Sequence, residues 1–245
     1  MARSNVGLRV DNYPMVTEVQ DRHSPDIVPV VVACEVMKAE LEAAARGRSV
    51  RFFFLDQGLH RTPNKMATLI QEKIDSLPKS IKRVALAYGL CSNGILGVKT
   101  AGRELVVPRC HDCVALFLGS PAAYREAFDS RPGTYYLTPG WVAAKKDPLG
   151  IIYDDYAARF DLKTAFWVME EELKHYTHIA LINTGAGDIE VLRARTRENC
   201  QCLKKEYVEI QGSLEYFSKL VEGRYNEDEF LILPPGTELT QEMFF

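Results

Sequence analysis

Short apolar runs rich in Val, Ile and Phe alternate along this chain with longer segments whose apolar residues recur at helical spacing. The runs lie at 27–34, 49–56, 81–89, 103–109, 177–185, 207–212 and 230–236. Continuous β-branched runs are typical of strands buried on both faces, and strands that alternate with helices predict a mostly parallel sheet with right-handed crossovers. We therefore predict an α/β, Rossmann-like fold with helices on both faces of the sheet, arranged as one domain or as two lobes.

The chain divides into three regions by this pattern. Residues 1–26 are polar and aperiodic, and we interpret them as an N-terminal arm. A cysteine-bearing α/β region follows over 27–141, and a second α/β region over 142–245 belongs to the same domain or to another, with a hinge predicted near 140–152. Within the second region, apolar spacing predicts one long amphipathic helix over 153–176.

Charge and hydropathy exclude several classes of protein. The formal net charge is -3 with mixed signs and no basic block, which argues against nucleic acid as a partner. The longest apolar runs are too short to span a bilayer, and the first residues lack a secretory signal. We therefore expect a cytoplasmic protein without a membrane partner. In that reducing compartment, the six cysteines are expected to be free thiols or metal ligands rather than disulfides.

Three cysteines stand at the ends of predicted strands. Cys34 ends the first strand, Cys91 lies in the turn after the third, and Cys113 follows the fourth. Parallel strands end at one edge of a sheet, and ligands bind in the crevice outside that edge. Three thiolates leave one coordination position open, as in a catalytic zinc site or an iron–sulfur cluster with an accessible iron. The pattern predicts such a site, with zinc and a cluster both open.

Two histidines and a carboxylate lie near the same predicted edge. His60 follows the second strand, and His111 and Asp112 follow the fourth. Either imidazole could be a fourth ligand or a catalytic group, and Asp112 could orient a neighbouring imidazole, as carboxylates near metal sites often do. Burying His and Asp without partners is costly, which favours a functional cluster over chance.

Three other interpretations of the cysteines stay open. A cysteine at a strand end is often only a small buried apolar residue. Cys110 and Cys113 form a C-x-x-C pair that could exchange disulfides if it opened a helix. Cys91 lies in the sequence GLCSNG, which is similar to a nucleophile elbow, with His60 or His111 as its base. Cys200 and Cys202 fall on different sides of a late charged helix and are not expected to bind a metal together.

Several long motifs resemble the domain-of-unknown-function family numbered 1638, which occurs in anaerobic bacteria and methanogenic archaea. The resemblance extends from about residue 27 to the late FLILPPG. The motifs are VACEVMKAEL, FLDQGLHRTPNKMATLIQEKID, YGLCSNGILGV, VPRCHDCVALFLGS and PGTYYLTPGW. Their matching positions include Cys34, His60, Cys91, His111 and Cys113. Cys110 matches less consistently, which weakens the C-x-x-C interpretation.

The resemblance implies a role by association. Members of the family often occur beside corrinoid-dependent methyltransferases, which suggests anaerobic one-carbon or methyl-group metabolism. Our leading hypothesis is a metalloprotein that activates a small-molecule substrate at the open position. Candidate substrate-binding residues are Asn93, Ser120, Tyr136 and Trp141. The alternatives are a non-catalytic accessory protein that binds a corrinoid or a corrinoid protein, and a metal-free cysteine enzyme that uses Cys91.

Overall fold

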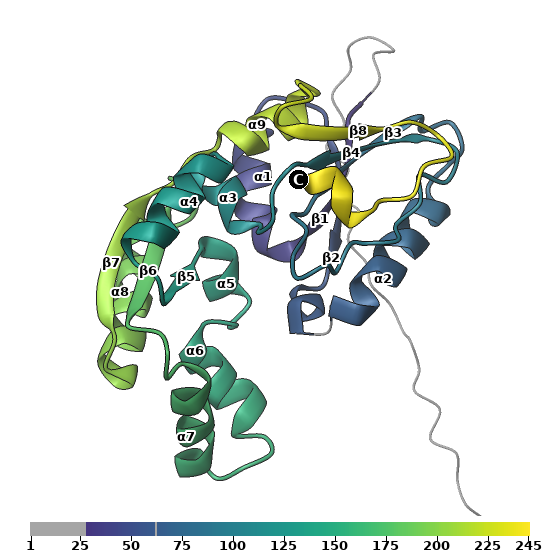
Figure 1. The fold of residues 1–245 in the computed structure, drawn as a ribbon. Coiled ribbons are helices and arrows are strands. Elements are labelled where there is room, and N and C mark those ends of the chain that lie inside the picture. The colour runs from purple at the N-terminus through teal and green to yellow at the C-terminus, as the bar shows by residue number, and fades with distance from the viewer. Residues whose placement is uncertain (1–27, 62) are drawn as a thin grey trace, which may run out of the picture.

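A computed structural model describes the backbone of residues 28–61 and 63–245, together with the side chains of these residues other than 60, 61 and 63. The arm predicted over 1–26 lies outside the described residues. The chain forms two sheets, which lie apart from one another with helices between them (Figure 1).

The larger sheet has five strands in the order β2-β1-β3-β4-β8. Its strands are β1 (Val30–Cys34), β2 (Arg51–Leu55), β3 (Arg83–Ala87), β4 (Glu104–Pro108) and β8 (Phe230–Leu233). The first four are parallel, and β8 pairs antiparallel with β4 at the edge. β1 is wholly buried, and β3 and β4 are buried at every residue after the first. This burial explains their continuous apolar runs.

The smaller sheet has three parallel strands in the order β5-β6-β7. They are β5 (Thr134–Leu137), β6 (His178–Asn183) and β7 (Glu206–Gln211). The two sheets do not coincide with the sequence regions 27–141 and 142–245, because β5 joins the later strands and β8 returns to the earlier ones. The prediction of a mostly parallel, Rossmann-like α/β fold is confirmed.

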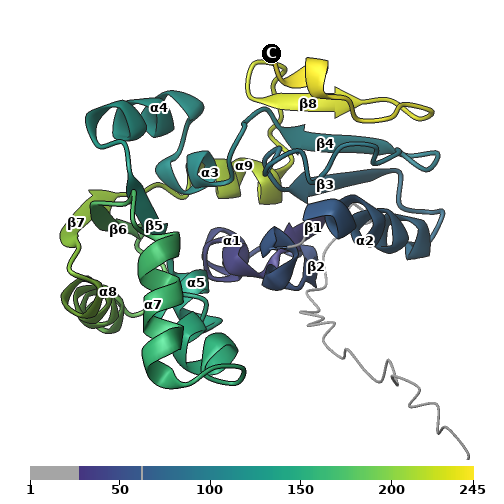
Figure 2. The same cartoon turned by 60° about the horizontal axis from the view of Figure 1, so that its bottom comes forward.

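Helices fill the space between the sheets and cover their outer faces. The helices are α1 (Lys38–Ala44), α2 (Pro63–Ser76), α3 (Val114–Leu118), α4 (Pro121–Ser130), α5 (Pro139–Ala143), α6 (Pro148–Gly150), α7 (Leu162–Glu172), α8 (Ile189–Leu203) and α9 (Glu215–Glu222). Both views place α1, α3, α5 and α9 between the two sheets (Figure 2). No helix in the described part of the chain has the length and apolar character needed to cross a bilayer.

Shorter helical turns complete the fold. The 3₁₀ turns are η1 (Glu35–Met37), η2 (Gln57–Arg61) and η4 (Gln241–Phe244), and η3 (Ile151–Tyr156) is π-helical. The single helix predicted over 153–176 is wrong, because η3 ends at Tyr156 and α7 begins only at Leu162. The reason is local: the Asp161 side chain accepts a hydrogen bond from the Thr164 N–H at 3.1 Å and caps a new helix.

The chain passes between the sheets twice, and the two passages lie side by side. The first leaves α3 toward α4 and β5, and the second leads from β7 into α9. The Ser213 N–H donates to the Phe117 carbonyl at 2.8 Å, which joins the two passages. Gly119 has a φ of 87°, and a β-carbon on it would lie 2.7 Å from Ser213 Cβ, so this position requires glycine.

Two hydrophobic clusters form the core. The larger covers the five-stranded sheet and continues through α3 and α9, while the smaller packs the second sheet against α7 and η3. Trp141 in α5 packs against both clusters. The two halves of the molecule are therefore joined by apolar packing as well as by the two passages of the chain.

Candidate functional site: a thiol cluster at the sheet edge

Three cysteines follow strands that are direct neighbours in the larger sheet. Cys34 is the last residue of β1, Cys91 lies shortly after β3, and Cys113 lies shortly after β4. Because β1, β3 and β4 are adjacent and parallel, their carboxyl ends meet at one edge. The topology thus brings the three cysteines to the edge at which α/β proteins commonly bind ligands.

The backbone after β3 runs directly alongside the backbone after β4. The Leu90 N–H donates to the Cys110 carbonyl at 2.9 Å, and the Cys91 N–H donates to the His111 carbonyl at 3.0 Å. A β-carbon on Gly89 would lie 2.9 Å from the Cys113 nitrogen, closer than real contacts allow. Glycine at position 89 therefore permits the approach that places Cys91 beside Cys113.

Cys91 begins an unusual turn. Cys91, Ser92 and Asn93 have φ angles of 48°, 56° and 66°, all in the left-handed region that non-glycine residues rarely adopt. The Gly94 N–H closes the turn on the Cys91 carbonyl at 3.0 Å. Backbone strain of this kind costs on the order of 1–3 kcal/mol for each residue and clusters at functional sites. The strain marks this turn as a functional candidate.

The thiols of Cys91 and Cys113 share a hydrogen bond. That bond is the largest cause that raises the pKa of the Cys113 thiol well above its usual range, followed by burial and by the neighbouring Cys91, Asp112 and Cys34. Burial raises the pKa of the Cys34 thiol to about 12. A hydrogen bond with the Val36 backbone lowers this pKa in part, and the neighbouring Cys91 raises it further. Cys34 and Cys113 are therefore protonated at neutral pH in the absence of a metal.

Cys110 lies in the same neighbourhood, although it matches the family motifs less consistently than the other three cysteines do. Its side chain is buried, and burial raises the pKa of its thiol well above the usual range, with Cys91 and Asp112 adding to the rise. Four thiols are therefore gathered at this edge. The other two cysteines lie elsewhere: Cys200 is buried in α8 and Cys202 is exposed, which confirms that they face different sides of their helix.

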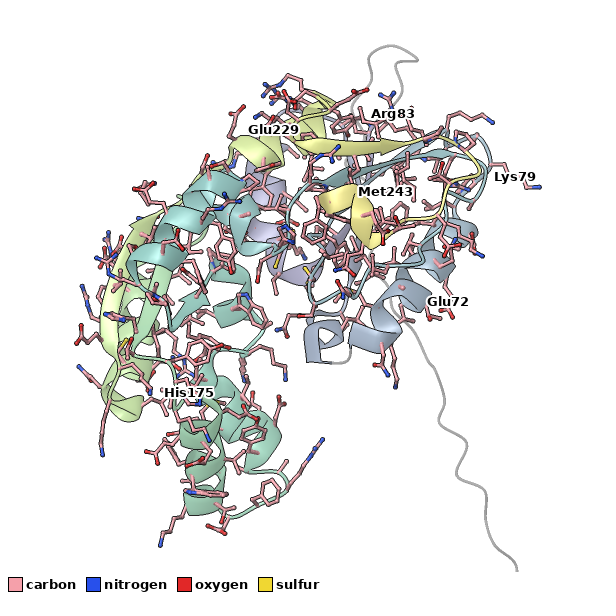
Figure 3. All side chains as sticks on the ribbon, viewed as in Figure 1. Glu72, Lys79, Arg83, His175, Glu229 and Met243 are labelled. Carbon is pink, nitrogen blue, oxygen red and sulfur yellow. The ribbon has the colours of Figure 1, made fainter. Side chains whose placement is uncertain are left out.

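The polar residues beside Cys113 hold the loop and the end of the chain. Asp112 Oδ1 accepts the Val114 N–H at 2.8 Å at the start of α3. His111 is exposed, and its ring lies 4.9 Å from the ring of Phe245. Arg109 Nη1 donates to the carbonyl of Met243, labelled in Figure 3, at 2.7 Å. The side chain of His60 lies outside the described residues, so its predicted role stays a prediction.

Tyr136 of the smaller sheet faces the Asp112 loop. Burial is the larger cause that raises the pKa of Tyr136, and the charge of Asp112 adds to the rise. Burial and then Asp112 likewise raise the pKa of Tyr124 in α4 to about 12. The two tyrosine rings lie 6.2 Å apart. The Tyr136 hydroxyl is buried and has no hydrogen-bond partner in the described part of the structure. Tyr136 therefore remains the most suitable of the predicted substrate-binding residues.

The other three predicted substrate-binding residues have different surroundings. Ser120 Oγ accepts the Ala123 N–H at 3.0 Å and caps α4. Asn93 is exposed in the strained turn, and Trp141 is half-buried between the two hydrophobic clusters.

Sequence reasoning missed three buried polar side chains that follow strands, two of them in the larger sheet and one in the smaller. Tyr88 follows β3, Gln57 follows β2, and Thr138 follows β5. All are at most 3% exposed, and their side-chain polar atoms have no hydrogen-bond partner within the described residues. Their strand-end positions were the available signal. Only the packed structure shows that their polar atoms are left unpaired.

The thiol cluster has donors that suit a metal ion but, within the described residues, not the arrangement that would hold one. Among the side chains that the structure describes, no three His, Cys, Asp or Glu donors are arranged so that they could hold an ion as they stand. The chemical character of the donors nevertheless suits thiophilic metals, because three thiols lie at one edge. Binding would require the thiols to lose their protons and turn toward one point.

These features define the class of the protein: an α/β protein with one mostly parallel and one wholly parallel sheet, joined by two adjacent chain passages, with a buried thiol cluster at the carboxyl edge of the larger sheet. The chain belongs to a family of proteins of unknown function, DUF1638, whose model matches residues 54–221. This match confirms the resemblance seen in the sequence motifs. No curated protein and no solved structure matches the chain.

Proposed function

We propose that Cys34, Cys91 and Cys113 form a thiolate site for zinc or for an iron–sulfur cluster, with one coordination position open to a small substrate. One observation carries the proposal. Three buried thiols from three neighbouring strand ends interact with one another, and two of them share a hydrogen bond. Buried cysteines that serve only as apolar filling have no reason to gather in this way.

The surroundings of the thiols support metal binding over free-thiol chemistry. Burial and mutual proximity keep Cys34 and Cys113 protonated, so neither is a ready nucleophile. A bound cation would replace the thiol protons and offset the repulsion among the thiolates. When bound, such a centre supplies a Lewis acid or a redox group with a vacant position. Asp112, held by the Val114 N–H, adds negative charge beside it.

Two tyrosines from outside the larger sheet lie beside the proposed site. Tyr136 on β5 and Tyr124 on α4 both interact with Asp112, and the Tyr136 hydroxyl has no partner among the described residues. A small polar substrate that binds between the sheets would satisfy that hydroxyl. We infer a reducing, cytoplasmic setting because none of the six cysteines, all within the described residues, forms a disulfide. A place in methyl-group metabolism beside a corrinoid protein remains a proposal from the family resemblance alone.

Metal analysis of anaerobically purified protein tests this function. Iron and sulfide together with broad visible absorbance would identify a cluster, and zinc without colour would identify a zinc site. The chain should also take up Zn²⁺, or a cluster assembled from iron and sulfide, after metal removal. A folded protein that contains no metal and takes up neither would overturn the proposal.

A second candidate function is a metal-free enzyme with Cys91 as nucleophile. The φ of 48° at Cys91 favours it, because nucleophile elbows hold their nucleophile in a strained backbone conformation between small residues. Gly94 fits this pattern, since a β-carbon on it would lie 2.9 Å from the Met66 sulfur. Brief treatment with iodoacetamide would distinguish the two: selective alkylation of Cys91 supports a nucleophile, whereas protection of all three cysteines by Zn²⁺ supports the metal site.

A further inference from the structure

Tyr88 is a buried tyrosine whose hydroxyl lacks a partner beside the thiol cluster. It directly follows β3, and because Ala33 pairs with Ala87, Tyr88 and Cys34 come next in the register of the two strands. The side chain is 0% exposed and is among the largest fully buried ones. Its hydroxyl finds no hydrogen-bond partner within the described residues.

A buried hydroxyl without a partner destabilises the folded protein, and phenylalanine would fill the same space without that hydroxyl. Leaving such a group unsatisfied costs the free energy of removing it from water with no compensating hydrogen bond. Native proteins keep few such groups, and each calls for an explanation. The surroundings suggest one, because Tyr88 interacts electrostatically with Cys34, Cys91, Cys113 and Asp56, which together with the larger effect of burial raise the pKa of Tyr88 well above its usual range. The phenol O–H is a hydrogen-bond donor that has no acceptor among the described residues.

We propose that the Tyr88 hydroxyl donates a hydrogen bond to a thiolate sulfur of the three-cysteine site when a metal is bound, and so acts as a positioning residue for that sulfur. The inference rests on the proposed function. A protonated thiol is only a weak acceptor, whereas an anionic sulfur accepts much more strongly. The Tyr88 hydroxyl therefore gains a strong acceptor only in the metal-bound state, so that its hydrogen bond forms together with metal binding.

The molecule contains a matched control for this inference. Tyr216 in α9 is also 0% exposed, and its hydroxyl also lacks a partner in the described part of the chain. Its thiol neighbour is Cys110, which is outside the proposed ligand set. Replacing Tyr216 by Phe removes the same buried group without touching the three ligands.

The test is a titration of the reduced full-length chain with Co²⁺ under anaerobic conditions, followed by competition with Zn²⁺. Tyr88→Phe should bind the same amount of metal as the wild type, with an affinity lower by roughly 10- to 100-fold, the range seen when hydrogen-bond partners of metal ligands are removed. The thiolate-to-cobalt absorption should also shift. Tyr216→Phe should match the wild type in both. Tyr88→Met, a second apolar replacement, should reproduce the loss if Tyr88→Phe folds poorly.

The outcomes separate this inference from the proposed function. Wild-type protein that binds cobalt through the three cysteines, with Tyr88→Phe unchanged in affinity and absorption, would overturn the inference and leave the function intact. Equal losses in Tyr88→Phe and Tyr216→Phe would also overturn it. If the chain accepts only an iron–sulfur cluster, Tyr88→Phe should lower the reduction potential, and an unchanged potential would overturn it. A wild type that binds neither overturns both proposals.

Discussion

Gly140 lies against the backbone of Val36, so that α5, the helix after β5, contacts the turn that follows Cys34. A β-carbon on Gly140 would lie 1.9 Å from the Val36 carbonyl oxygen and 2.4 Å from its carbonyl carbon. The contact is between two backbones, which cannot yield as a flexible side chain can. This junction therefore fixes the distance between the smaller sheet and the end of β1.

Replacing Gly140 by Ala should be strongly destabilising. The added methyl group must push α5 and η1 apart, and overpacking of this kind costs about 1–3 kcal/mol or more. We expect a lower free energy of unfolding in urea and, in protein that still folds, weaker metal binding. Gly223→Ala is the control, because Gly223 has open space around it and only its φ of 72° opposes a side chain. Equal stability of Gly140→Ala and wild type would contradict the contact.

The three-cysteine site predicts a selective pattern of metal loss. Cys34→Ser, Cys91→Ser and Cys113→Ser should each reduce the metal content from about one centre per chain to near zero, since a thiophilic metal needs all three ligands. Cys110→Ser should retain the metal, and exposed Cys202→Ser is the control for purification. Elemental analysis measures the content. Loss in Cys110→Ser together with retention in Cys34→Ser would show that the ligand set was chosen wrongly.

Glu40 should make stability depend on pH. It is 0% exposed in α1, its Oε1 accepts the Thr184 hydroxyl at 2.9 Å, and burial raises its pKa from 4.5 to about 7. Between these values the unfolded chain loses its proton while the folded chain keeps it. The contribution of the protonated carboxyl is therefore fully present below pH 4.5 and is lost as the pH rises through about 7, by about 3 kcal/mol at roughly 1.4 kcal/mol per pKa unit.

Glu40→Gln tests this dependence because the amide stays neutral and keeps an oxygen for Thr184. Urea unfolding of both proteins at several values between pH 4 and 8 should show the wild type losing stability relative to the variant as the pH rises. A stability difference that does not change with pH would contradict the assignment.

Asp147 should be essential for the smaller half of the molecule. It is 1% exposed, and its Oδ2 accepts hydrogen bonds from Arg195 Nε at 2.8 Å and Asn199 Nδ2 at 2.7 Å. Asp147→Ala leaves these donors without their partner and should lower the free energy of unfolding by about 3–5 kcal/mol. Glu198→Ala, which removes an exposed partner of the same Arg195, should cost less than about 1 kcal/mol. Similar losses in the two variants would contradict this difference.

The sequence was sufficient to predict the parallel strands and the shared edge of Cys34, Cys91 and Cys113. Strand signals are local, and in a parallel sheet the end of a strand determines the edge at which a residue lies. The sequence was not sufficient to assign strands to sheets. β8 pairs with β4 across about half of the chain, and this pairing depends on packing between distant residues that no local pattern records.

Details of the site were beyond sequence reasoning for a similar reason. Three successive residues other than glycine form the left-handed turn at Cys91, so the sequence did not predict its backbone conformation. The hydroxyl of Tyr88 became notable only because its surroundings offer it no partner. The proximity of Cys110 to Cys91 follows from two hydrogen bonds between adjacent loops, which Gly89 permits.

The late return of the chain to the larger sheet has a consequence for synthesis on the ribosome. Strands β1 to β4 emerge first, but the strand that covers the open edge of β4 emerges only after the whole smaller sheet. Until then the nascent chain presents an unpaired, apolar strand edge, which invites aggregation. Truncated chains that end before Phe230 should therefore depend on chaperones far more than the full-length protein does.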